Sequence, residues 1–152
     1  MHALRKATLP FVVICAVQTH ALALDPPPTP AQLRQWKGDE CVAAGKRVGI
    51  DYAHALDRAI SGDPVGLTEL FRFTVSDGFD GAAADNHCSI LLGLLQRWSD
   101  DAFARVLRRE KARIRKAVID AIDYSFPHPG WKRTQFPHTY SLAPHEHAPP
   151  DA

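Results

Sequence analysis

The sequence predicts an all-α fold of short antiparallel helix pairs, followed by an irregular C-terminal tail rich in proline and aromatic residues. Two observations support this prediction. Apolar residues recur at the three-and-four spacing of one helix face, most clearly between residues 82 and 98. Segments 62–70 and 99–107 also resemble each other weakly at an offset of 37 residues. A period of this length is typical of HEAT-like repeats, a right-handed stack of α-α pairs.

The N-terminus, residues 1–23, has the order of a secretory signal peptide. Arg5 and Lys6 precede an apolar run over residues 7–17, and small residues then suit a cleavage after Ala23. The apolar run is too short to span a membrane, and no later stretch reaches the roughly 20 apolar residues that a transmembrane helix needs. We therefore expect a periplasmic or secreted protein with no integral membrane segment after cleavage.

Composition divides the rest of the chain into three parts. Residues 24–30 form a proline-rich spacer, 31–142 a single helical domain, and 143–152 a disordered tail. Cleavage removes two of the 18 basic residues and none of the 17 acidic ones, so the mature chain stays close to neutral. This balance gives no support for binding to nucleic acid.

Start and stop signals mark the expected helices. Thr29-Pro30 and Asp63-Pro64 each place a capping side chain before a proline at the first helical position, and Ser99-Asp100-Asp101 supplies a third cap. Glycine is expected to break or loosen the first helical region at Gly45 and Gly49. The expected helices are 30 to about 44, 50–60, 64 to about 75, 82–98, 101–109 and 112 to about 124.

The segment that follows, residues 125–142, contains prolines that exclude long regular structure. Its aromatic side chains can still anchor it against the helices, and the last residues, 144–152, are expected to be loose. The expected aromatic anchors are Phe126, Trp131, Phe136 and Tyr140.

Four motifs lie between residues 71 and 107: Asp77-Gly78, Ala84-Asp85-Asn86-His87, Leu91-Leu92-Gly93-Leu94-Leu95 and Asp100-Asp101-Ala102-Phe103. With these motifs, residues 71–107 resemble small exported proteobacterial proteins that have no assigned activity. The resemblance implies a fold and a location but no reaction.

The leader carries Cys15, so the mature chain retains Cys41 and Cys88. An even pair of cysteines in an exported protein is a candidate disulfide. Two buried free thiols are the alternative, since both residues lie in helical segments and the sequence does not show whether their Cα atoms come within about 7 Å. His87 beside Cys88 could form a cysteine nucleophile. Neighbouring helix positions seldom face each other, however, so we assign no catalytic residue.

Two surfaces could bind ligands. The tail histidines His128, His138, His145 and His147 could hold zinc or copper, although a solvated tail is the simpler interpretation. A basic run with a single acid, Glu110, could face an anionic partner, although some of its cations would complement a helix end. The residues of this run are Arg105, Arg108, Arg109, Lys111, Arg113, Arg115 and Lys116.

No phosphate-binding loop, zinc-protease helix or nucleophile elbow occurs in the sequence. The leading hypothesis is therefore a non-enzymatic helical binding or adaptor protein whose partner is another protein of the cell envelope, with no resident cofactor. One alternative is an envelope protein that binds metal through the tail histidines, with His54 or His87 as further ligands. The other is a small hydrolase with Cys88 as its nucleophile.

Overall fold

The computed structural model describes residues 26–125 and 133–143, and the regular elements in these ranges are helices, which confirms the all-α prediction. The predicted signal peptide and parts of the tail lie outside these ranges. The helices include α1 (Pro30–Trp36), α2 (Gly38–Arg47), α3 (Tyr52–Ile60), α4 (Pro64–Phe73), α5 (Gly81–Trp98), α6 (Asp100–Leu107), α7 (Ala112–Tyr124) and α9 (Pro137–Tyr140).

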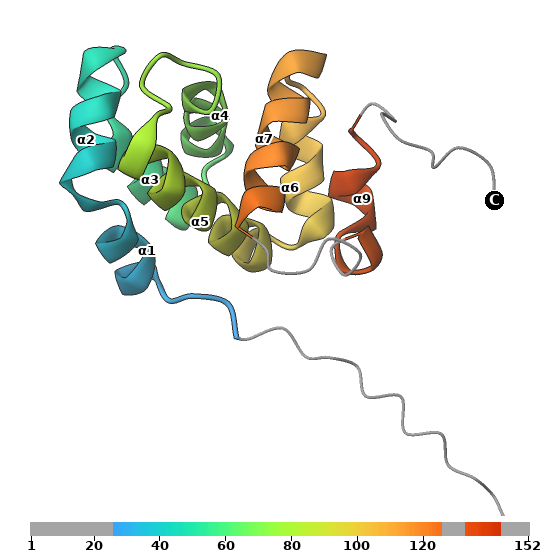
Figure 1. Ribbon diagram of the computed structural model, residues 1–152. Coiled ribbons are helices and arrows are strands. Elements are labelled where there is room, and N and C mark those ends of the chain that lie inside the picture. Colours follow the sequence, from blue (N-terminus) through green and yellow to red (C-terminus); the bar gives the residue numbers. More distant parts are fainter. Residues whose placement is uncertain (1–25, 126–132, 144–152) are drawn as a thin grey trace, which may run out of the picture.

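The long helix α5 lies at the centre of the arrangement and contacts α1, α2, α6 and α7 (Figure 1). Its buried side chains join those of the other helices in one hydrophobic core. None of the helices in the described ranges is both long and apolar enough to cross a bilayer. The largest fully buried side chains are Tyr52, Phe71, Phe73, Phe103, Leu33, Leu56, Leu67, Leu70, Ile90, Leu91 and Leu94.

Two of the three predicted helix caps are confirmed. Thr29 accepts a hydrogen bond from the backbone N–H of Gln32 at 3.3 Å, and the Gln32 side chain accepts one from the N–H of Thr29 in return. The Asp63 carboxylate accepts from the N–H of Val65 at 2.8 Å. The third cap was predicted wrongly, because Ser99 makes no side-chain capping bond and has a φ of 67°.

The single helix expected over residues 30–44 is two helices. Gly38 has a φ of +55°, a conformation that glycine adopts readily, and the chain turns there between α1 and α2. Gly45, which was expected to weaken the helix, lies buried inside α2. A side chain there would stand 2.7 Å from the Ile50 carbonyl oxygen, so this glycine allows the start of α3 to pack closely.

The principal helix contacts join α3 with α4, α2 with α5, and α5 with α7. Gly66 allows the first of these, because a Cβ there would stand 2.5 Å from the carbonyl oxygen of Ala55. Helices that lie side by side are thus often distant in the chain, and the HEAT-like pairing of consecutive helices is not confirmed.

The C-terminal segment uses its helix α9 to pack against α6, at the end of the molecule away from α1 and α2 (Figure 1). Phe136 and Tyr140 are buried, as the sequence predicted for these two anchors. The Tyr140 hydroxyl donates a hydrogen bond to the Asp123 carboxylate at 2.8 Å. The other two expected anchors, Phe126 and Trp131, lie outside the described residues.

Candidate functional site

His87 is fully buried, and both of its ring nitrogens have hydrogen-bond partners. The Tyr52 hydroxyl lies 2.6 Å from Nδ1, and Oγ1 of Thr74 lies 2.9 Å from Nε2. The Thr74 hydroxyl also donates to the carbonyl oxygen of Leu70 at 3.3 Å, so it accepts from Nε2–H. The Tyr52 hydroxyl therefore donates to an unprotonated Nδ1, and every polar group of the ring is satisfied.

Aromatic rings enclose the imidazole on several sides. Phe73, Tyr52 and Phe79 meet it edge to face, with ring centroids 5.0, 5.6 and 5.7 Å away. Burial lowers the pKa of His87 to about 3, which keeps the ring neutral at physiological pH. His87 is therefore a structural residue of the core, and neither of its ring nitrogens is free to take a proton from Cys88.

Cys41 and Cys88 are free, buried thiols, so the structure shows the free-thiol alternative and not the candidate disulfide. Cys41 lies 3.5 Å from the carbonyl oxygen of Ala83, to which its thiol donates. Burial raises the pKa of each thiol to about 11, with a further contribution from the Asp85 carboxylate at Cys88. A thiol with so high a pKa is a poor nucleophile at neutral pH, since the thiolate is the reactive form.

The predicted histidine ligands lie mostly beyond the described residues, where His128, His145 and His147 fall. His138 is exposed at the start of α9, and its backbone N–H donates to the Asp100 carboxylate at 2.7 Å. Within residues 26–125 and 133–143, no group of three histidine, cysteine or acidic side chains converges to hold a metal ion. The tail metal site therefore stays a prediction.

Three cations of the basic run have an acidic or carbonyl partner, and the other four have no acidic partner in the described part of the chain. Arg105 pairs with Asp101 at 3.2 Å and Lys116 with Asp120 at 2.9 Å, both one helical turn apart. Arg115 is half-buried and donates to the carbonyl oxygen of Glu110 at 2.7 Å. The other four cations are exposed; together we call them the basic corner. They are Arg108, Arg109, Lys111 and Arg113.

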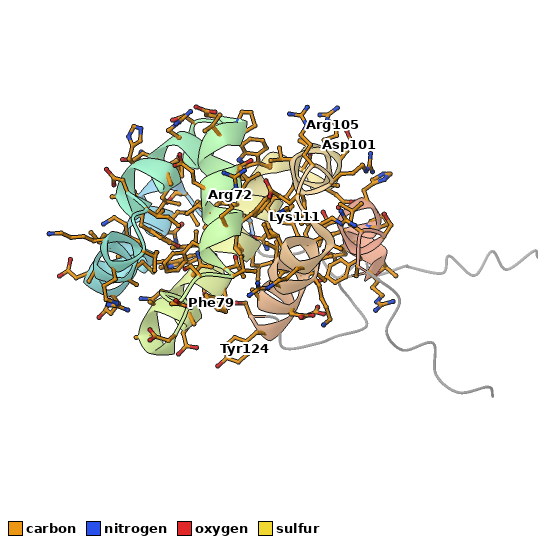
Figure 2. All side chains as sticks on the ribbon, turned by 90° about the horizontal axis from the view of Figure 1, so that it is seen from above. Arg72, Phe79, Asp101, Arg105, Lys111 and Tyr124 are labelled. Carbon is orange, nitrogen blue, oxygen red and sulfur yellow. The ribbon has the colours of Figure 1, made fainter. Side chains whose placement is uncertain are left out.

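The single acid of the run does not neutralise the basic corner. The Glu110 carboxylate lies 3.8 Å from the guanidinium of Arg72, and its side chain is only 9% exposed. Figure 2 shows Arg72, from the end of α4, on the same face as Lys111. Arg72, a cation from a distant helix, thus pairs with Glu110, so this acid is not available to neutralise the basic corner.

Helix ends explain some of these cations but not all. Arg105 and Arg108 lie at the C-terminal end of α6, where the helix dipole favours positive charge. Lys111 and Arg113 lie at the N-terminal end of α7, where the dipole disfavours it. No acid occupies the first turn of α7, and no side chain caps it. Each such cation costs about 0.3–1 kcal/mol at an exposed helix end.

Sequence reasoning found the basic run but overestimated its free charge. The spacing of Asp101 with Arg105 and of Lys116 with Asp120 is the helical i,i+4 spacing, so these pairs could have been anticipated from the sequence. The contribution of Arg72 could not, because it depends on how α4 packs.

Comparisons of the chain with protein-family models, with curated proteins and with solved structures find no match in any of the three. The class of protein therefore rests on the fold and the surface. They define an all-α protein with an exposed basic corner at the junction of α6 and α7. The resemblance to small exported proteobacterial proteins stays a prediction.

Proposed function

We propose that this chain is a non-enzymatic helical binding protein of the cell envelope, and that its basic corner docks an acidic surface of a partner protein. The observation that carries the proposal is the placement of Lys111 and Arg113 at the uncapped N-terminus of α7. These cations oppose the local helix dipole and have no acidic partner among the described residues. An electrostatic arrangement that weakens the isolated fold is expected where a partner uses it.

An acidic partner would relieve this repulsion in two ways. Its carboxylates would neutralise the four cations of the basic corner, and they would accept hydrogen bonds from the free N–H groups that begin α7. Charge complementarity of this kind mainly raises the rate and the selectivity of association. Export to the envelope, proposed from the N-terminal sequence, provides the compartment in which the two proteins meet.

The test is site-specific photo-crosslinking in cells that export the protein. We expect Ala112→p-benzoylphenylalanine, at the exposed start of α7, to yield a discrete adduct with an acidic protein. The same replacement at the exposed Ala43 of α2 should not yield it. Salt at about 0.5 M, which screens exposed charges beyond a few ångströms, should suppress the adduct.

Two matched variants isolate the charge. K111Q/R113Q should reduce the adduct at least about tenfold, since it removes the two cations at the helix start. The control K37Q/K46Q removes two cations near α2 and should leave it unchanged. An adduct that persists in K111Q/R113Q, or the absence of any adduct specific to position 112, contradicts the proposal.

A further inference from the structure

A second surface, distinct from the basic corner, is a groove of about 350 Å³ between α5, α7 and the loop before α5. Phe79 and Tyr124, which both line it, lie near each other in Figure 2, away from Arg105. The apolar lining comes from Phe79, Ala84, Cys88, Ala117 and Ala121, and the polar rim from Asp85, Asp120 and Tyr124.

Small side chains keep the groove open. Ala84 and Cys88 lie four residues apart on α5, and Ala117 and Ala121 lie four apart on α7. Residues at this spacing share one helix face, so each wall of the groove presents short side chains. Helices that pack over such residues leave a space that longer side chains would have filled.

The two aromatic residues of the groove are held differently. The ring of Phe79 packs edge to face against the buried His87 ring at 5.7 Å, so the core holds it in place. Tyr124 is 72% exposed. The lining thus has one aromatic ring fixed by the core and one that solvent reaches.

The charged groups that line the groove are both carboxylates. Asp120 is already paired with Lys116 at 2.9 Å. Asp85 has no cationic partner in the described ranges. The hydrogen bond that its carboxylate accepts from the Tyr124 hydroxyl, together with its negative charge, raises the pKa of the Tyr124 phenol. The neighbouring Cys88 is a neutral thiol at physiological pH, because its pKa is raised to about 11. The rim therefore offers a negatively charged hydrogen-bond acceptor beside an apolar lining.

We propose that this groove binds a small apolar amine, with its apolar body against the alanines and Phe79 and its ammonium group beside Asp85. The volume lies at the lower end of the range of ligand pockets and suits a body of roughly ten heavy atoms. The inference is independent of the proposed partner, since it uses another face and the opposite charge.

Three probes with one apolar body and different head groups test the inference. They are 4-phenylbutylamine, 4-phenylbutan-1-ol and 4-phenylbutyrate, titrated into the full mature chain with labelled alanine methyl groups. The amine should shift the methyl signals of Ala84, Ala117 and Ala121, while those of the buried Ala44 and Ala59 stay in place. The affinity should fall from amine to alcohol to carboxylate.

Two variants separate the charge from the cavity. D85N should lower the affinity for the amine about threefold to fivefold and leave the affinity for the alcohol unchanged, because an exposed charge pair contributes modestly to binding. A117L should lower the affinity for all three probes, because the larger side chain fills the groove. D39N removes an exposed acid elsewhere and should change nothing.

Equal affinity for the three probes would overturn the ligand class, because the groove would then select apolar bodies alone. Unmoved alanine methyls at about 5 mM amine would overturn the site, because a ligand of this size that gains about 0.3 kcal/mol per heavy atom would occupy much of the groove at that concentration. Tighter binding of a capped Phe-Lys dipeptide than of the amine would also overturn the small-molecule assignment, in favour of a partner peptide.

Discussion

At the scale of single residues, His87 shows how a residue with catalytic chemistry becomes structural. Its partners come from α3 and from the end of α4, and together with the surrounding rings they satisfy and enclose the imidazole. The sequence placed His87 on an inward helix face but did not identify these partners. Tyr52 and Thr74 lie 35 and 13 residues away, and only the packing of their helices brings them to the ring.

The buried imidazole predicts that acid destabilises the protein. The pKa of His87 is lowered from 6.5 to about 3 in the folded chain, so below pH 6.5 the unfolded chain binds more protons. Stability that is fully present above pH 6.5 is therefore lost as the pH falls toward 3. For this group alone, the free energy of unfolding should drop by about 2 kcal/mol between pH 7 and pH 5.

Urea unfolding at both pH values measures this loss. H87Q should remove most of the difference, whereas H54Q, which changes an exposed histidine, should retain it. If H87Q does not fold, the ring of the wild-type protein can be titrated by NMR. A pKa of His87 near 6.5 would contradict the assignment.

At the scale of elements, local chemistry predicted helices better than it predicted their ends. Caps that depend on residues close in sequence, such as Thr29 with Gln32, follow from side-chain chemistry alone. The break at Gly38 was missed because glycine also occurs inside helices, as Gly45 does here. Whether a glycine ends a helix or permits a close contact depends on what packs beside it.

The start of α7 predicts a stabilising substitution at a surface position. R113E should raise the free energy of unfolding by about 1 kcal/mol, because it places an acid in the first turn beside three remaining cations. R105E makes the same change in the last turn of α6, where it opposes the dipole and breaks the pair with Asp101. It should lower the free energy of unfolding by a similar amount.

Urea unfolding of the two variants at low salt gives the comparison. A change of the free energy of unfolding in the same direction for both variants would show that the helix dipole does not control the stability of this corner. R113E should also reduce the crosslinked adduct at position 112, since the stabilised helix start would then repel an acidic partner. Stability gained with binding lost is the expected mark of a functional surface.

At the scale of the whole molecule, the sequence predicted the composition of the core but not its arrangement. Inward-facing residues such as Leu67, Leu94 and Ile122 were identified by their spacing, and all three are fully buried. The contacts of α5 with α2 and of α5 with α7 join segments far apart in the chain, and no local signal encodes them. The groove depends on one of these contacts and was therefore not predicted.

The role of Asp100 likewise emerges only from the complete fold. The sequence assigned it to the start of α6, yet its carboxylate accepts from the backbone N–H groups of His138 and Thr139, at 2.7 and 2.8 Å. The side chain thus holds the beginning of α9, which lies 38 residues further along the chain. It joins the C-terminal segment to the helical body, beside the buried Phe136 and Tyr140.

D100A should therefore detach α9 rather than unfold α6. It leaves two N–H groups without an acceptor, and the fully buried Thr139 cannot regain its bond from water without opening the segment. We expect a loss of about 1–3 kcal/mol in the free energy of unfolding and faster hydrogen exchange at Thr139 and Tyr140. D101A removes the neighbouring acid from the same helix turn, so it controls for the effect on the dipole of α6. Exchange in α9 that is equally fast in both variants, or unchanged in D100A, would show that the apolar anchors alone hold the segment.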